Sequence, residues 1–214
     1  MRMHILLKAI GTMILIAVFF GAYFYLLKNP AYPTTVMPFT PLDRMFSFYP
    51  QAMPLYISLW VYVSLPPLMF STRSELCRYA LALAITCFAG LIIFYFWPTS
   101  VAVANIDWAA YPGVNFLKNI DASGNACPSL HVATALFSGV WLHHLLRRFS
   151  APGWLLLFNG VWCIGIIYST LATRQHVALD VAGGVVLGGL AACLSLRHRQ
   201  QLESAGKIER PSIK

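Results

Sequence analysis

Charge is scarce in this sequence. Only 10% of its 214 residues are charged while 58% are hydrophobic, and Asp and Glu together number 7. A soluble chain of this size needs a polar surface around its core, so the composition excludes an ordinary soluble domain and requires a bilayer as solvent. The sequence also lacks low-complexity linkers and internal repeats, which indicates one folded unit.

Paired cysteines and clustered cations are missing as well. The five cysteines show neither a disulfide framework nor metal-ligand spacing, so they indicate no cysteine-held metal site. Cys127 lies near polar motifs, but without a neighbouring cation to activate its thiol we expect it to pack. The net charge of +8 is scattered over short loops and a tail. That distribution fits anionic lipid headgroups and excludes a nucleic-acid partner.

Long hydrophobic runs dominate what remains. Each run approaches the roughly 20 residues that a helix needs to cross the hydrocarbon. We therefore predict an all-α, polytopic membrane protein built as a six-transmembrane-helix bundle, with a membrane domain at 1–196 and a basic cytoplasmic tail at 197–214. The six runs are 9–27, 52–71, 79–97, 130–146, 154–171 and 177–196.

The cations predict the orientation of the bundle. Cytoplasmic loops of membrane proteins are enriched in Lys and Arg. The loops that would face the other side hold only Lys28, Arg44, Lys118 and Arg174. Both termini are therefore predicted to be cytoplasmic. The richer side carries Arg2, Lys8, Arg73, Arg78, Arg147, Arg148, Arg197, Arg199, Lys207, Arg210 and Lys214.

A histidine and an aspartate mark the start of the last run, in Arg174-Gln175-His176-Val177-Ala178-Leu179-Asp180. Residues four apart share one face of a helix, so Asp180 would hold one ring nitrogen of His176 and leave the other basic. Ionisable groups at a membrane edge are energetically costly, so their presence suggests a function, and His176 would serve as a nucleophile. A purely structural His–Asp pair explains the same spacing.

A second polar cluster opens the fourth run, in Asn125-Ala126-Cys127-Pro128-Ser129-Leu130-His131. Pro128 suits a first helical turn, the amides beyond it form an anion site, and Ser129 adds a hydroxyl. His131 would donate a proton to a leaving oxygen. Taken alone, the cluster is also typical of a helix N-cap beside a surface histidine. Because the fourth and sixth runs point the same way, both histidines are expected at one depth.

Together these residues resemble two signatures of the type 2 phosphatidic acid phosphatase (PAP2) superfamily. The matching elements are Pro128-Ser129-Leu130-His131 and the spacing of Ser169, His176 and Asp180. The Asn-x-x-Pro-Ser-Leu-His form is similar to the branch of inositol phosphorylceramide synthases and related bacterial proteins. The resemblance implies that His176 attacks phosphorus, Asp180 orients it and His131 is the acid and then the base. It also implies that the reaction needs no metal and no other cofactor.

The phosphate-holding arginines of the family are absent. Its first signature would fall at Trp97–Ala104, which contains no cation, and Thr170 stands where an arginine follows the serine. Arginine matches phosphate oxygens well, so either another group holds the phosphate or the activity is altered or lost. We expect Arg174 to compensate first, with Lys118 and Arg44 as weaker candidates. Ser129 and Asn125 complete the predicted phosphate site.

The resemblance implies hydrolysis of a lipid phosphate monoester or diphosphate through a phosphohistidine. Transfer of the phosphate or a phospho-headgroup to an alcohol uses the same first step and stays open, as does a non-catalytic lipid-phosphate binding or transport protein. We expect a phosphorylated lipid as partner in a bacterial inner membrane, with the site facing the periplasm or exterior. The sequence gives no oligomeric state.

Overall fold

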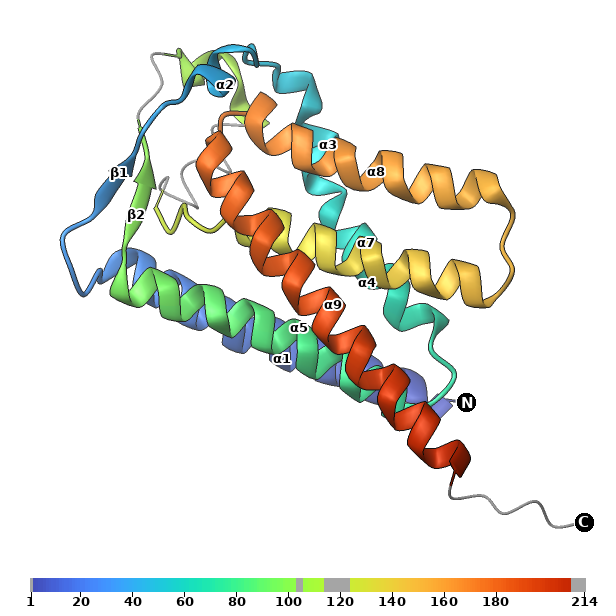
Figure 1. Cartoon of the computed structure of the whole chain (residues 1–214). Coiled ribbons are helices and arrows are strands. Elements are labelled where there is room, and N and C mark those ends of the chain that lie inside the picture. Colours follow the sequence, from blue (N-terminus) through green and yellow to red (C-terminus); the bar gives the residue numbers. More distant parts are fainter. Residues whose placement is uncertain (1, 103–105, 114–123, 209–214) are drawn as a thin grey trace, which may run out of the picture.

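The computed structural model describes residues 2–102, 106–113 and 124–208. Two short 3-10 turns lie at Pro50–Ala52 and Trp108–Ala110. The other elements are α1 (Arg2–Lys28), β1 (Thr35–Met37), α2 (Pro41–Arg44), α3 (Met53–Ile57), α4 (Leu59–Met69), α5 (Arg73–Phe96), β2 (Thr99–Val101), α7 (Leu130–Arg148), α8 (Gly153–Ala172) and α9 (Ala178–Ile208). Within these residues the long helices form a bundle, with β1, β2 and α2 at one end and the short α4–α5 and α7–α8 connections at the other (Figure 1).

Four helical segments in the described part of the chain are long and apolar enough to cross a membrane. They are Pro50–Met69, Arg73–Phe96, Gly153–Ala172 and Ala178–Arg197. Each coincides with one of the predicted runs, so the helical membrane fold agrees with the composition. A shorter apolar stretch, Ile16–Lys28, lies within α1.

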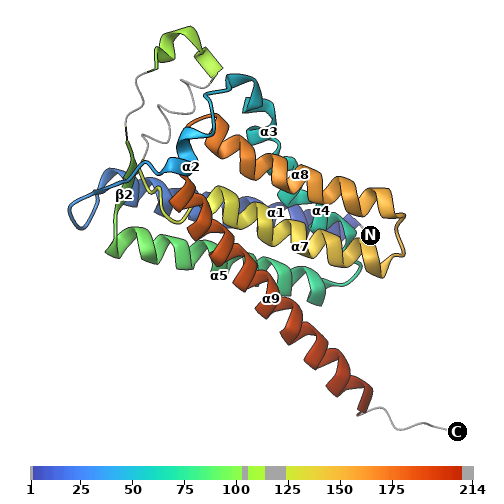
Figure 2. The same ribbon diagram turned by 45° about the horizontal axis from the view of Figure 1, so that its top comes forward.

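The helix α7 is the centre of the bundle. It packs against α4, α5, α8 and α9, and both views show it enclosed by its neighbours (Figures 1 and 2). A helix that faces other helices contacts little lipid, so its surface need not be uniformly apolar. This position explains how α7 carries polar side chains such as Ser138 and His131 in the middle of a membrane bundle.

Small residues allow α9 to approach α7 closely. A Cβ atom at Gly184 would collide with the main-chain oxygen of Ser129, and one at Gly188 would collide with that of Ala133. The Gly184-x-x-x-Gly188 pair therefore serves close helix packing, as the spacing predicts. Because Ser129 opens α7, this contact also sets the start of α9 against the start of α7.

Two short strands join the loops at the end of the bundle. β1 pairs in parallel with β2, with Thr35 opposite Thr99 and Met37 opposite Val101. Loop one (Lys28–Gln51) and loop two (Pro98–Pro128) are thereby connected. The all-α prediction did not include this ribbon, because three-residue strands between prolines leave no alternating hydrophobic pattern to detect.

Polar side chains buried between the helices are hydrogen-bonded. The Tyr62 hydroxyl donates to Asn159 Oδ1 at 2.6 Å, and Asn159 Nδ2 donates to the Gly139 carbonyl at 3.0 Å. The hydroxyls of Tyr79 and Ser138 lie 3.0 Å apart. These bonds link α4, α5, α7 and α8 and satisfy groups that water cannot reach.

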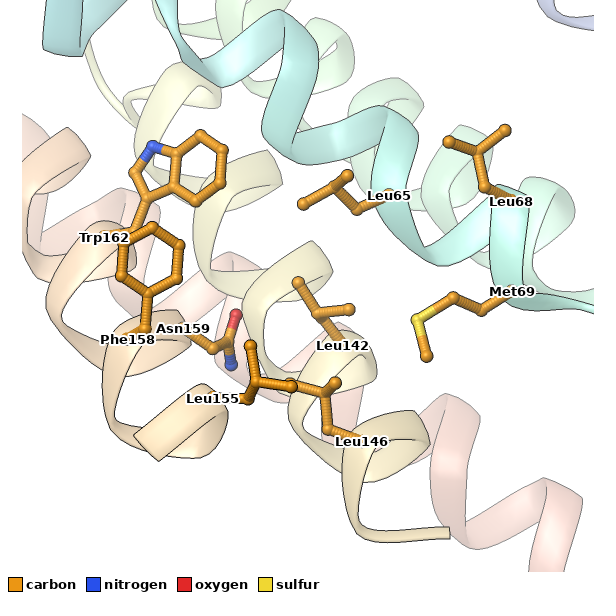
Figure 3. A pocket seen from close by; sticks show the side chains of 9 residues that line it. All are labelled: Leu65, Leu68, Met69, Leu142, Leu146, Leu155, Phe158, Asn159 and Trp162. Carbon is orange, nitrogen blue, oxygen red and sulfur yellow. The ribbon is translucent and has the colours of Figure 1, made fainter. Parts of the chain in front are cut away.

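An apolar pocket of about 250 Å³ lies between α4, α7 and α8 (Figure 3). Its walls come from the halves of these helices that lie away from loops one and two. A packed cluster that includes Leu59, Ala135 and Ile166 adjoins the pocket and shares Leu142 with its lining. The lining residues are Leu65, Leu68, Met69, Leu142, Leu146, Leu155, Phe158, Asn159 and Trp162.

Candidate active site

His176 lies in the short connection between α8 and α9. Arg174 takes a left-handed backbone with φ of 56°, and the main-chain N–H groups of Gln175 and His176 both donate to the Thr170 carbonyl. The prediction that His176 shares a helix with Asp180 was wrong, since α9 begins only at Ala178. The sharp turn after Thr170 nevertheless holds the imidazole over the first turn of α9.

The pairing of His176 with Asp180 follows from this turn. His176 Nδ1 lies 3.6 Å from Asp180 Oδ2, with the exposed fractions of the two side chains at 8% and 0%. The same Oδ2 accepts from the Val177 N–H at 3.0 Å. A carboxylate on the Nδ1 side favours the tautomer that leaves Nε2 with its lone pair. The geometry therefore suits a nucleophile that acts through Nε2.

Ser129 caps α7 and ties it to α9. Its hydroxyl accepts from the Val132 N–H at 3.3 Å, and its own N–H donates to the Asp180 carbonyl at 2.9 Å. Ser129 is therefore the N-cap residue of α7, as one of the two interpretations of this cluster predicts. Two of the amides at this helix start are already used within the protein.

Tyr56 of α3 holds the imidazole of His131. The two rings are stacked, with centroids 3.9 Å apart and planes at 17°, and the Tyr56 main chain hydrogen-bonds to the imidazole. His131 and His176 also lie close enough to interact electrostatically. The structure thus brings together His131, His176, Asp180 and Ser129 at the end of the bundle where α7 and α9 begin (Figure 1).

Four buried side-chain polar atoms in the described part of the chain have no hydrogen-bond partner. They are His131 Nε2, Gln175 Nε2, His176 Nδ1 and Asp180 Oδ1. All four belong to the two motif segments. An unsatisfied buried polar atom costs about 1–3 kcal/mol, so such a cluster calls for a functional reason. Gln175, only 6% exposed, was not predicted, although a glutamine between Arg174 and His176 at the start of an apolar run was a visible signal.

Arg174 faces loop one. Its Nη1 donates to the Asp43 carbonyl at 3.2 Å and its Nη2 to the Phe46 carbonyl at 2.5 Å. The guanidinium also lies 5.1 Å from the centroid of the Phe39 ring. These bonds use two of the five guanidinium N–H donors on main-chain oxygens.

Asp43 is a second residue that the sequence analysis missed. Its side chain is 1% exposed. Oδ1 accepts from the Ala178 N–H at 2.7 Å, and Oδ2 accepts from the N–H and hydroxyl of Thr40 at 2.8 and 2.6 Å. The three-residue spacing from Thr40 to an acidic residue, with Pro41 between, is a known helix-start pattern and was the available signal.

The remaining predicted phosphate ligands lie in three different settings. Asn125 has a left-handed backbone, and its Nδ2 donates to the Tyr23 carbonyl of α1 at 3.1 Å. Arg44 is exposed at the end of α2. Lys118 lies outside the described residues.

The stretch where the family's first, cationic signature would fall, Trp97–Ala104, contacts the segment that precedes α7. Thr99, in β2, accepts the Cys127 N–H on its hydroxyl at 2.8 Å. Burial, and the nearby Asp180 carboxylate, raise the pKa of the Cys127 thiol to about 11. A thiol with this pKa is a poor nucleophile at neutral pH, in agreement with a packing role. No group of three His, Cys, Asp or Glu side chains suited to a metal ion occurs within the described ranges.

One comparison with known proteins gives a match. A family model described as the PAP2 superfamily matches residues 73–203. The matched stretch contains α5, α7, α8 and both polar motifs. Comparisons with curated proteins and with solved structures give no match.

Proposed function

Because the chain belongs to the PAP2 superfamily, we propose that it is a metal-independent lipid phosphatase that forms a phosphohistidine on His176. The observation that carries this proposal is the proximity of two imidazoles, one from the first turn of α7 and one from the α8–α9 connection, with the Asp180 carboxylate 3.6 Å from Nδ1 of His176. Phosphatase-type or phosphotransferase-type activity is what the family indicates. The substrate, the intermediate and the residue roles are our proposal.

In the proposed first step, His176 Nε2 attacks the phosphorus of a lipid phosphate. The N–P bond forms as the bond from phosphorus to the lipid oxygen breaks, and His131 gives its Nε2 proton to that oxygen. Asp180, on the Nδ1 side of His176, stabilises the positive charge that develops on the ring. Two displacements thus replace one difficult step.

In the second step, His131 takes a proton from water. The hydroxide attacks phosphorus, the N–P bond breaks and inorganic phosphate leaves. His131 is protonated again for the next cycle, so protons balance over the two steps. The partnerless Nε2 of His131 and Nε2 of Gln175 are the groups we assign to the phosphate oxygens.

We further propose that six helices span the membrane and that both termini are cytoplasmic. Four apolar helices make the chain an integral membrane protein. α1 and the enclosed α7 supply the other two spans, and the Lys and Arg distribution supplies the orientation. The active site then faces the outside of the inner membrane of a bacterium, where a phosphorylated lipid reaches it from the outer leaflet.

Phosphotransfer is a second candidate, and the engagement of Arg174 favours it. With that guanidinium bonded to loop-one carbonyls, the described site offers imidazole and amide groups to the phosphate. Such donors neutralise less charge than a pair of arginines, so they suit a singly charged phosphodiester better than a phosphomonoester. The acceptor would be an alcohol, as the Asn-x-x-Pro-Ser-Leu-His resemblance to inositol phosphorylceramide synthases implies.

The test is product analysis with purified protein in lipid nanodiscs. Radiolabelled diacylglycerol phosphate, prenyl diphosphate and phosphatidylinositol are each supplied with and without a lipid alcohol or free inositol. Release of inorganic phosphate supports the phosphatase. A new labelled lipid without inorganic phosphate supports the transferase. Lipid binding without turnover, unchanged by His176→Ala, would leave only a binding protein.

A further inference from the structure

Loop one holds both ends of the segment that carries His176. At one end, the guanidinium of Arg174 donates to the carbonyls of Asp43 and Phe46. At the other end, the carboxylate of Asp43 accepts from the N–H of Ala178. His176 lies midway between these two anchored residues. Both views place α2, which contains Asp43, against the junction of α8 and α9 (Figures 1 and 2).

The N-terminus of α9 is therefore occupied by carboxylates of the protein itself. Val177 N–H donates to Asp180, and Ala178 N–H donates to Asp43. A helix start attracts anions because its first N–H groups lack partners within the helix. Here the N–H groups of Val177 and Ala178 are taken, so Asp43 fixes the start of α9 with an N–H that a phosphate could otherwise use.

The same loop also reaches the His131 side of the site. Its strand β1 pairs with β2, and Thr99 of β2 accepts from Cys127 two residues before Ser129. Loop one then leads into α3, where Tyr56 stacks on His131. One continuous stretch of chain thus contacts both halves of the site.

We propose that Asp43 and Arg174 are positioning residues that set the placement of His176 relative to His131, and that loop one is the frame that holds the two imidazoles in register. The inference rests on the proposed phosphohistidine chemistry. Arg174 is thereby assigned to loop one rather than to the phosphate. Neither side chain needs to touch the substrate for this role, because each acts through the main chain on either side of His176.

The test compares Asp43→Ala, Asp43→Asn, Arg174→Ala and Arg174→Lys with Asp107→Asn. Asp107 is an exposed aspartate that caps a turn in loop two, so it is a matched control. We expect the two Ala variants to lower kcat about 10²-fold, the effect of roughly 1 Å of misplacement, with KM changed less than about threefold. Asp43→Asn keeps an oxygen for Ala178 and should retain more activity than Asp43→Ala. The control should match the parent protein.

Three measurements separate positioning from other roles. A raised KM with unchanged kcat would mean direct substrate binding and would overturn the proposal. A loss of activity that only follows the fraction of unfolded protein would also overturn it. Hydrogen exchange of residues 174–180 can be measured without turnover. The Ala variants should exchange faster in this segment than the parent protein. Unchanged exchange would contradict the role of loop one in holding the His176 segment.

Failure of the chemistry is recognised separately. If neither the parent protein nor any variant turns over a phosphorylated lipid, the proposed function fails. The exchange experiment then still decides whether Asp43 and Arg174 hold the His176 segment. Normal turnover by the parent protein together with normal kcat in both Ala variants would reject the positioning role alone.

Discussion

Within the described residues, buried polar side chains are hydrogen-bonded in the middle of the helical core, whereas several at its loop end keep an atom without a partner. In the middle of the bundle, the hydroxyl of Tyr62 and both polar atoms of the Asn159 amide are paired with each other or with the Gly139 carbonyl. At the loop end, His131, Gln175, His176 and Asp180 each keep a buried atom without a partner. Both regions contact α7 and both are shielded from water.

This difference distinguishes the buried polar groups that stabilise the fold from those that we assign to the chemistry. A paired group rigidifies the fold, whereas an unpaired buried group destabilises it by about 1–3 kcal/mol. Every partnerless buried side-chain atom in the described ranges lies on a motif that resembles a phosphatase signature. We interpret that loss of stability as the consequence of keeping His131 and Gln175 available for the phosphate and Asp180 beside His176. The comparison predicts that changes at the loop end alter chemistry and changes in the middle alter stability.

The largest effect is expected at His176. His176→Ala should lower kcat on the order of 10⁴-fold or more, because the covalent intermediate is lost. Thermal stability in detergent should stay level or rise, since one partnerless group is removed. His143→Ala is the control, an exposed histidine on α7 away from the site. Turnover of His176→Ala within tenfold of the parent protein would contradict the claim that the loop end carries the chemistry.

His131 should give the next largest effect. General acid–base catalysis contributes about 10²–10⁴-fold, so His131→Gln should slow lipid phosphate hydrolysis by that range. A nitrophenyl phosphate needs little help for its leaving group, so formation of the phosphoenzyme from it should be slowed much less. The parent protein should show a bell-shaped pH–rate profile, and the variant should lose one limb. Equal slowing of both substrates would contradict the acid role.

In the paired region the effect should be on stability. Asn159→Ala removes the 2.6 Å bond from the Tyr62 hydroxyl, which keeps only the 3.2 Å bond to the main-chain carbonyl of residue 159, and it removes the side-chain donor to the Gly139 carbonyl. These losses should lower the free energy of unfolding by about 1–2 kcal/mol. The kcat of the folded fraction should stay within about twofold. Thermal unfolding and activity at low temperature measure the two quantities. A large fall in kcat without destabilisation would mean that the middle of the bundle takes part in the chemistry.

The smallest effect is expected at Cys127, which lies at the loop end in an apolar cluster with Met37, Val101 and Val177. With its pKa raised to about 11, the thiol stays protonated at neutral pH and becomes a thiolate only as the pH rises toward that value. Cys127→Ser should leave kcat within about twofold, and alkylation of the parent protein should be slow at pH 8. Fast modification at pH 7 that stops turnover would contradict this assignment.

The sequence predicted the helices well because apolar length and helix caps are local signals. α8 and the start of α7 fall within two residues of the predicted runs. α5 begins at Arg73, six residues before the predicted run at 79, because Thr72 caps it and its first turns are charged. Hydropathy detects the part of a helix that lies in lipid, not its ends.

The long-range parts of the site could not be predicted in the same way. Asp43 resembled a solvated loop charge between prolines, and its burial depends on Ala178, which is 135 positions away. Arg174 was expected on phosphate, but its direction is set by two carbonyls of loop one. The two histidines were predicted to lie at one depth because the number of spans alone gives the direction of each helix. The direction of a side chain in a turn cannot be inferred from the number of spans.

Trapping the intermediate tests the central claim most directly. The protein in nanodiscs is mixed with a ³²P-labelled lipid phosphate, quenched in alkali, which preserves phosphohistidine, and mapped by mass spectrometry. The account predicts label on His176, faster label loss when His131 is present than in His131→Gln, and no label in His176→Ala. Label on any other residue, or turnover by His176→Ala at the parental rate, would contradict it.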